Sequence, residues 1–239
     1  MLANFADCYS HAIVDGLYLE LVRGQALLFY FAIHICKVMR SLYFLSSNIN
    51  KFIEIYQILH RYNVAVKFLN IKLREIQADS LNEIAEEKSK DAFRAVSKPV
   101  IIEDDGLFIH RLNGFPGPNS SFVFKTIGNP GILKLLSHIR DRSASFVSVF
   151  VFNDGNTVRT FVGKTEGRVS SKIDGPGWGY DPIFIPTGSE LTFGQLKDRK
   201  IRISHRGKAI NAFAKWYVRN YLQIKRPQPA RLEQPRPTR

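Results

Sequence analysis

Three carboxylates stand side by side in this chain, at Glu103, Asp104 and Asp105, directly after the apolar run Val100–Ile102. Neighbouring anionic side chains repel one another unless a positive charge lies between them. At the end of a strand, a divalent metal ion with oxygen ligands commonly supplies that charge. The alternative is a solvated acidic loop. The segment therefore indicates either a cation site or a water-facing turn.

Asp104 lies between the other two acids, and we assign it to metal binding and to the activation of water. A carboxylate that holds a metal ion and accepts a proton from a bound water is suited to hydrolysing a phosphoanhydride. Glu75 is a more distant candidate ligand, because it lies between a β-rich run and a helix. Taken alone, Glu75 would be a surface acid.

Two segments are suited to binding phosphate. Residues 46–51 read Ser-Ser-Asn-Ile-Asn-Lys at the expected junction between a strand and a helix. Small polar residues cap a helix start, whose free N–H groups favour an anion that Lys51 can also reach. Capping without binding fits the same residues. Lys200 and the run Ser204-His205-Arg206 add basic groups that suit a polyphosphate, unless they form a solvated loop.

The turn at residues 175–182, Gly-Pro-Gly-Trp-Gly-Tyr-Asp-Pro, is suited to holding a heterocyclic base. Its glycines allow a ligand to approach the backbone closely. Trp178 and Tyr180 offer flat surfaces for stacking, and Asp181 can accept hydrogen bonds. A plain turn with aromatic residues in the core is the alternative. Together the four segments describe one site with a base pocket, a cationic clamp and a carboxylate-held metal.

The elements that must position these groups alternate between strands and helices. Apolar spacing predicts strands at 42–45, 64–73 and 100–102, and helices at 50–62, 81–96, 132–139 and 203–222. Two β-rich runs, 145–152 and 157–162, are joined by Asn153-Asp154-Gly155-Asn156, which predicts a hairpin. This order predicts an α/β domain with a mixed sheet over residues 41–222.

Composition limits the class of partner. The chain has 239 residues, 45% of them hydrophobic, and a formal net charge of +13. This excess favours an anionic partner, which is a nucleic acid, a nucleotide or an acidic membrane surface. The uncharged run Gly24–Cys36 is shorter than the roughly 20 residues that span a bilayer. Two cysteines without metal-ligand spacing indicate a reducing, cytoplasmic setting.

The two ends differ from the body in character. Residues 1–40 are apolar without clear turn signals, and we expect a helical or disordered extension, with Met39 as an alternative start. The tail at 223–239 has four prolines and five basic residues, and we expect it to be disordered. A weak arm for nucleic acid is the alternative for this tail.

Over about residues 41–220 the chain resembles the inosine triphosphate pyrophosphatase family, the diphosphatases of noncanonical purine nucleoside triphosphates, and especially its archaeal members. Ser46–Lys51 is similar to the family's opening Thr/Ser-Gly/Ser-Asn-x-x-Lys, and Glu103–Leu107 to its Asp/Glu-Asp-Ser-Gly-Leu. Three further segments are similar to family motifs. Gly114–Gly117 matches a Gly-x-Pro-Gly turn, and Trp178–Phe184 matches a Phe-Gly-Tyr-Asp-Pro-Ile-Phe run. Lys200 with Ser204–Arg206 matches a closing Lys…Ser-His-Arg. The order and spacing of five segments make the resemblance specific.

The resemblance implies hydrolysis of hypoxanthine and xanthine nucleoside triphosphates (dITP/ITP, XTP/dXTP) to monophosphate and pyrophosphate, which cleanses the nucleotide pool. It implies Mg²⁺, a homodimer, and an elongated mixed β-sheet with flanking helices in two lobes around a central nucleotide cleft, with no membrane or obligate nucleic acid as partner. Asp104 corresponds to the proton acceptor and metal ligand, and Glu75 to a second metal ligand. The positions that correspond to substrate contacts are Ser46, Ser47, Asn48, Ile49, Asn50, Lys51, Asp105, Trp178, Gly179, Tyr180, Asp181, Lys200, His205 and Arg206.

The chain departs from the family pattern at three positions. Asp105 replaces Ser or Thr, Gln195 replaces Glu, and Trp178 replaces Phe. Asp105 places negative charge beside the triphosphate, either as an extra metal ligand or at a cost in binding. Two other functions stay open: a Maf-type pyrophosphatase acting on modified pyrimidine or methylated guanine nucleotides, and a noncatalytic, basic nucleic-acid-binding protein. Three adjacent acids disfavour the latter, because they would repel a phosphate backbone.

Overall fold

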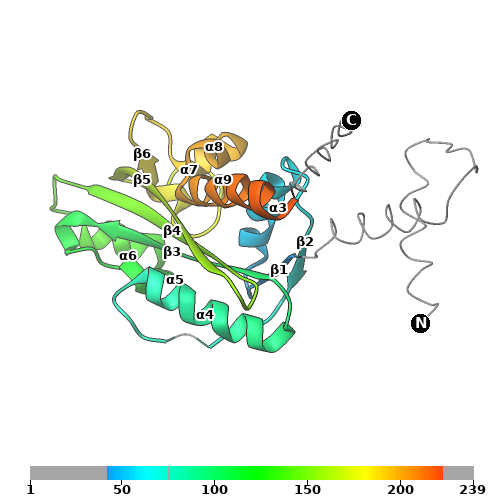
Figure 1. The fold of residues 1–239 in the computed structure, drawn as a ribbon. Coiled ribbons are helices and arrows are strands. Elements are labelled where there is room, and N and C mark those ends of the chain that lie inside the picture. The colour runs from blue at the N-terminus through cyan, green and yellow to red at the C-terminus, as the bar shows by residue number, and fades with distance from the viewer. Residues whose placement is uncertain (1–41, 75, 223–239) are drawn as a thin grey trace, which may run out of the picture. The chain divides into compact units, whose positions relative to one another are not determined.

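A mixed sheet of six strands forms the centre of the part of the chain that the structure describes, in the order β2-β1-β3-β4-β5-β6 (Figure 1). The structure is a computed structural model that describes residues 42–74 and 76–222. Strand β1 pairs parallel with β2 and β3, and the other neighbours pair antiparallel. The strands are β1 (Leu42–Leu45), β2 (Val66–Leu69), β3 (Val100–Ile109), β4 (Ser143–Asn153), β5 (Val158–Val169) and β6 (Phe184–Pro186).

Helices cover both faces of this sheet, and Figure 1 shows α4 and α9 on opposite sides of it. The mixed α/β fold that the sequence predicted is therefore confirmed. The helices are α3 (Ile49–His60), α4 (Leu81–Val96), α5 (Ser120–Thr126), α6 (Gly128–Leu135), α7 (Phe193–Leu196), α8 (Lys200–Ile203) and α9 (His205–Tyr217). In the described residues no helix combines the length and the apolar character needed to cross a membrane.

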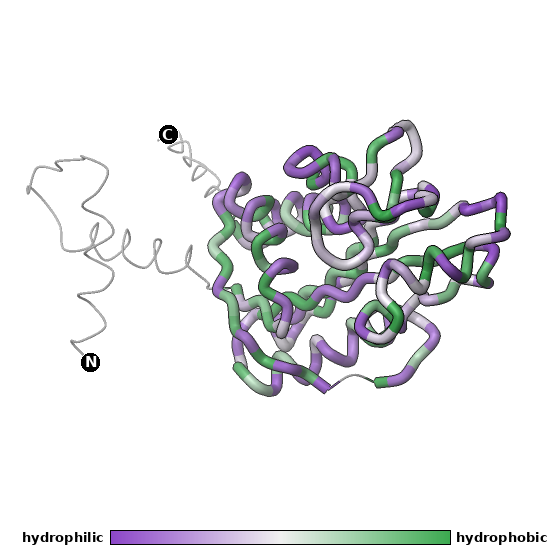
Figure 2. Tube along the Cα trace, turned by 180° about the vertical axis from the view of Figure 1, so that it is seen from behind, coloured by the Kyte–Doolittle hydropathy of each residue, from purple (hydrophilic) through white to green (hydrophobic). Residues whose placement is uncertain are grey.

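The central strand β4 is buried on both faces, because its alternating side chains meet a helix on each side. Phe150 and Phe152 join the core that α3 and α9 complete, whereas Val149 and Val151 pack with residues of α4. The helices carry both kinds of residue, because hydrophobic (green) and hydrophilic (purple) segments alternate along the tube in Figure 2. Burial on both faces fixes the register of the strands that carry the acids.

The predicted hairpin is confirmed. Strands β4 and β5 pair antiparallel from Ser143↔Arg168 to Asn153↔Val158. In the turn, the Asp154 carboxylate accepts hydrogen bonds from the N–H groups of Asn156 at 3.0 Å and Thr157 at 2.7 Å. Gly155 has a φ of +88°, which a residue with a side chain rarely adopts.

Several predicted boundaries were wrong. The β-rich run 64–73 is a strand only over Val66–Leu69, and the helix predicted at 132–139 is α6, Gly128–Leu135. The last helix begins at His205, because the hydroxyl of Ser204 caps it by accepting from the N–H of Gly207. The predictions for residues 1–40 and 223–239 lie outside the described residues.

Candidate active site

The three adjacent acids lie within β3, which continues to Ile109, so the prediction that they follow the end of a strand was wrong. Pairing with β4 along its length keeps the backbone extended there. Alternation then sends the acids to opposite faces of the sheet. Asp104 Oδ1 meets Lys88 Nζ of α4 at 2.7 Å, whereas Glu103 and Asp105 meet residues of α3 and α9.

Lys51 is positioned by the start of α3. The side chain of Asn48 caps the helix by accepting hydrogen bonds from the N–H groups of Asn50 at 3.0 Å and Lys51 at 3.4 Å. Lys51 Nζ then lies 2.9 Å from Glu103 Oε2 and 2.5 Å from Asp105 Oδ1. The capping interpretation of this segment is confirmed, and the same turn brings a lysine to the acids.

Arg206 is the centre of the charged cluster, with only 1% of its side chain exposed. Its guanidinium contacts three carboxylates: Nε lies 3.1 Å from Glu103, and its two terminal nitrogens lie 2.7 Å from Glu54 and 2.8 Å from Asp105. The planar fork of arginine suits such multiple contacts. The second residue of α9 is thereby tied to both β3 and α3.

Lys200 and Trp178 extend this cluster toward the predicted base pocket. Lys200 Nζ lies 2.7 Å from both Glu54 and Asp181. The ring of Trp178 lies under two cations, with its centroid 4.9 Å from the guanidinium carbon of Arg206 and 5.3 Å from Lys200 Nζ. Cations over an aromatic face are attracted by its quadrupole. Trp178 therefore lies between these cations and the predicted base pocket, on the wall of the cleft described next.

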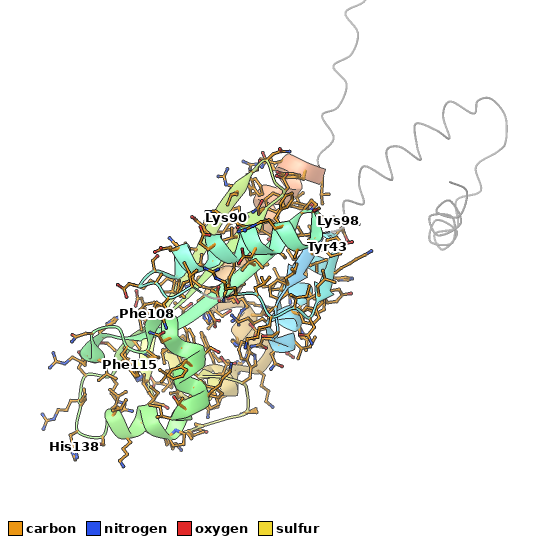
Figure 3. All side chains as sticks on the ribbon, turned by 90° about the horizontal axis from the view of Figure 1, so that it is seen from below. Tyr43, Lys90, Lys98, Phe108, Phe115 and His138 are labelled. Atoms are coloured by element: carbon orange, nitrogen blue, oxygen red, sulfur yellow. The ribbon has the colours of Figure 1, made fainter. Side chains whose placement is uncertain are left out.

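A cleft of about 1220 Å³ opens beside these groups. Phe115, in the turn after β3, lines it, and the next residue, Pro116, pairs with Phe108 of β3; Figure 3 labels Phe108 and Phe115. Ile49 and Lys200 do not line it, but Lys200 contacts Asp181, which does. The predicted residues on its wall are Ser46, Ser47, Asn48, Asn50, Lys51, Asp104, Asp105, Trp178, Gly179, Tyr180, Asp181, His205 and Arg206.

Comparison with known proteins identifies the family. Residues 42–216 match the model of the Ham1 family, which is most of the chain. The chain belongs to the Ham1 family. A dITP/XTP pyrophosphatase of Methanopyrus kandleri is 47% identical over 180 residues, covering 74% of this chain and 96% of that relative. One of Saccharolobus solfataricus is 43% identical, covering 75% of this chain and 94% of the relative.

Solved structures agree with this assignment. A HAM1 protein from Coxiella burnetii is 27% identical with a TM-score of 0.66, covering 76% of this chain and 100% of the other. The Ham1 protein of Staphylococcus aureus is 28% identical with a TM-score of 0.63, covering 73% and 97%. The α/β fold of this Ham1-family chain is therefore shared with its structural neighbours.

The cluster of this Ham1-family chain is not a simple positive clamp. Among the described residues, ion pairs join three cations to four carboxylates, namely Lys51, Lys200 and Arg206 with Glu54, Glu103, Asp105 and Asp181. The pair of Lys88 with Asp104 lies beside them on the other face of the sheet. Burial opposes ionisation of Glu54, but Arg206 and Lys200 outweigh it and lower its pKa to about 2. The basic groups are thus already paired before a ligand arrives.

Asp104 differs from the other carboxylates. Its Oδ2 is buried and has no hydrogen-bond partner. Burial raises the pKa of Asp104 above its ordinary value, against the opposing effect of Lys51 and Lys88. In the described ranges no three His, Cys, Asp or Glu side chains gather as a metal site, and Glu75 lies outside those ranges. The free oxygen nevertheless fits Mg²⁺, which commonly binds one or two carboxylates together with water and substrate phosphate.

His205 is a buried and neutral imidazole. Its ring stacks on Phe146 at a centroid distance of 4.2 Å and an angle of 3°. Both ring nitrogens lack a hydrogen-bond partner among the described residues. Asp105 Oδ2 lies 3.7 Å from Nε2, which is too far for a hydrogen bond. Burial lowers the pKa of His205 to about 4. A neutral imidazole has one donor and one acceptor, so it can contact either kind of group on a ligand.

Tyr180 belongs to the core rather than to an open stacking surface. Its ring packs edge-on against Phe124 at 5.4 Å, and its hydroxyl donates to the carbonyl of Ser120 at 3.0 Å. For Tyr180, the alternative prediction of an aromatic residue in the core is therefore the correct one. Of the two aromatic residues predicted to stack on a base, Trp178 is the one left for that role.

The sequence predictions missed Glu54 and Lys88. Glu54 lies three residues after Lys51, so both side chains occupy the same side of α3. Lys88 lies on the buried side of α4 with Leu81 and Ala85, where a lysine needs a partner. These helical spacings are the signals that could have identified both residues.

Proposed function

We propose that this Ham1-family protein hydrolyses noncanonical purine nucleoside triphosphates, dITP and XTP among them, to the monophosphate and pyrophosphate. Its relatives in Methanopyrus kandleri and Saccharolobus solfataricus are dITP/XTP pyrophosphatases. One observation supports the proposal most directly. A single cleft is lined by a carboxylate with a free oxygen, by cations for phosphate and by an aromatic ring for a base, which are Asp104, Lys51, Arg206 and Trp178.

In the proposed reaction, Asp104 accepts a proton from the water that attacks the α-phosphorus, and the bond to the leaving pyrophosphate breaks. A carboxylate whose pKa is raised by burial is, once ionised, a stronger base than an ordinary one. Lys51 and Arg206 bind phosphate oxygens and offset the charge of the leaving group. Trp178 stacks on the base, and His205 hydrogen-bonds to it.

Mg²⁺ is the proposed cofactor. Asp104 would hold it, with Glu75 as the second ligand implied by the family resemblance. When bound, the ion supplies positive charge that offsets the charge of the triphosphate. This contribution is needed because the cations of the cleft are already paired with carboxylates.

We also propose that residues 41–222 form the catalytic domain and that the protein is a cytoplasmic homodimer. The family match to residues 42–216 supports the domain limits. A chain limited to residues 41–222 is expected to keep its turnover, and sedimentation velocity over a range of concentrations tests the dimer.

The function is tested by measuring pyrophosphate release from dITP, XTP, dGTP, dUTP and dTTP, each with and without Mg²⁺. We expect strong preference for dITP and XTP, and loss of turnover without the metal. Preference for pyrimidine or methylated guanine nucleotides would instead support a Maf-type enzyme. Salt-sensitive binding of nucleic acid without pyrophosphate release would support a binding protein.

A further inference from the structure

Asp105 occupies the space between the two cations that are best placed to bind phosphate. Its Oδ1 lies 2.5 Å from Lys51 Nζ, and its Oδ2 lies 2.8 Å from a terminal nitrogen of Arg206. Both of its oxygens are therefore committed to cations from two different helices, α3 and α9. Its side chain is 15% exposed and lines the cleft, so the pair of ion pairs lies at the cleft wall.

A phosphate group would make similar contacts with these two side chains. Lysine and arginine bind phosphate and carboxylate oxygens with the same donors and at the same distances. A phosphate cannot approach Lys51 and Arg206 closely while Asp105 keeps both contacts, because the anions repel and compete for the same protons. The strand that carries the proposed base thus also carries a competing anion.

We propose that Asp105 is a built-in competitor for the phosphate site, which weakens the binding of polyphosphates until a ligand displaces its carboxylate from Lys51 and Arg206. This inference rests on the proposed function and deepens it by naming a residue that sets substrate affinity. The competitor limits binding by short anions, including the product pyrophosphate. A nucleoside triphosphate overcomes it because its base adds contacts at the opposite end of the site.

The rest of the cluster can tolerate removal of this carboxylate. Lys51 keeps Glu103 as a partner at 2.9 Å, and Arg206 keeps Glu103 at 3.1 Å and Glu54 at 2.7 Å. Neither cation is left alone in a buried place, which would be strongly destabilising. A neutral residue at position 105 is therefore expected to leave a folded protein with partly released cations.

The test compares the wild-type protein with Asp105→Asn and Asp105→Ser. Asparagine keeps the size of the side chain and removes its charge, whereas serine also removes its bulk. Asp91→Asn is the matched control, because it removes the same charge from a surface ion pair with Arg94. Binding of inorganic tripolyphosphate in excess Mg²⁺ is measured by isothermal titration calorimetry, and thermal melting reports whether each variant is folded.

We expect both Asp105 variants to bind tripolyphosphate roughly tenfold more tightly than the wild-type protein, and to be inhibited by pyrophosphate at correspondingly lower concentration. Asp91→Asn should match the wild type. Equal or weaker binding of tripolyphosphate by folded Asp105 variants would overturn the inference. If Asp105 instead contacts the sugar, its loss would raise the KM for dITP and leave tripolyphosphate binding unchanged.

Failure of the proposed function has a different signature. In that case the wild-type protein would release no pyrophosphate from dITP or XTP, whatever residue occupies position 105. The calorimetric comparison does not depend on turnover, so it reports on Asp105 separately.

Discussion

At the residue scale, Asp104 combines two properties that the proposed catalytic base needs. Lys88 holds Oδ1 at 2.7 Å and so fixes the orientation of the carboxylate, while Oδ2 stays free. The neighbouring acids Glu103 and Asp105 are instead engaged in ion pairs with Lys51 and Arg206. Strand alternation therefore separates the proposed catalytic carboxylate from two carboxylates held in ion pairs, within three consecutive residues.

We expect Asp104→Asn to remain folded and to reduce the kcat for dITP by roughly two to four orders of magnitude, because an amide cannot accept the proton. Steady-state pyrophosphate release measures the effect, and the melting temperature reports the fold. Asp91→Asn serves as the control with the same chemical change at the surface. Turnover of Asp104→Asn close to that of the control would assign the base to another residue.

The types of the site residues could be predicted from the sequence better than their contacts. Ser46–Lys51, Trp178–Asp181 and His205-Arg206 are recognisable because each segment has a local pattern. Their partners are not local, since Glu54 and Arg206 are 152 residues apart in the chain and meet at 2.7 Å. Local spacing carries no information on such pairs, and the paired state of the cations therefore appeared only in the structure.

At the element scale, the position of α9 depends on a close approach to β5. A Cβ atom at Gly163 would lie 2.0 Å from the carbonyl oxygen of His205 and 2.6 Å from the backbone nitrogen of Ala209. Both neighbours are backbone atoms of the helix, which cannot move aside as a flexible side chain can. Gly163 therefore sets how near His205 and Arg206 lie to the acids of β3.

Gly163→Ala is expected to push α9 away from the sheet, with a loss of roughly 1–3 kcal/mol in the free energy of unfolding. Because Arg206 moves with the helix, kcat/KM for dITP should fall by about tenfold or more. Urea unfolding and steady-state kinetics measure the two effects. Val162→Ala, at the adjacent half-exposed position, should change neither the free energy of unfolding nor kcat/KM. A fully active and stable Gly163→Ala would show that the position of α9 does not depend on this close approach.

A second contact between elements joins α6 to the turn at residues 175–182, which is proposed to hold the base. Asn129 is buried, and its Nδ2 donates a hydrogen bond of 3.0 Å to the carbonyl of Gly179. We expect Asn129→Ala to raise the KM for dITP roughly three- to tenfold with little change in kcat, because the variant loses one of several hydrogen bonds that hold the turn. Asn220→Ala removes a similar bond to Trp216 far from the turn and should behave as wild type. An equal loss of kcat would indicate a wider structural effect.

Elements with strong local signals could be predicted from the sequence, and those that depend on distant pairing could not. Helix α4 is found at Leu81–Val96 as predicted, because its apolar positions recur at helical spacing and Ser97 ends it in the left-handed conformation. Strand β3 was predicted only to Ile102, since three acids are poor strand residues. Its pairing with β4 from Val100 to Ile109 overrides that preference.

At the scale of the whole molecule, the net charge of +13 does not describe the site. The described cluster has one more carboxylate than cation when all are ionised. The overall charge can attract an anionic ligand from a distance. In the proposed reaction, binding in the cleft then requires exchange of ion pairs and a metal ion. Composition therefore predicted the class of ligand without predicting how the ligand binds.

Buried ionisable groups in the site also make the stability of the whole fold depend on pH. Burial, together with Arg206 and Lys200, lowers the pKa of His205 from 6.5 to about 4, although Asp105 opposes this shift. In the unfolded chain His205 takes up a proton below about pH 6.5, while in the fold it stays neutral until about pH 4. The stabilising effect is thus complete above pH 6.5 and is lost progressively as the pH falls from 6.5 to 4, by about 3 kcal/mol.

Urea unfolding at pH 7, 6 and 5 measures this loss directly. We expect His205→Gln to show a flatter dependence over that range, because glutamine does not titrate, whereas His138→Gln at an exposed position should keep the slope of the wild type. Glu54 affects stability only at lower pH, because its pKa falls from 4.5 to about 2 in the fold. Its stabilising effect is lost only below about pH 4.5. An unchanged slope in His205→Gln between pH 7 and 5 would mean that another group controls the acid sensitivity of the fold.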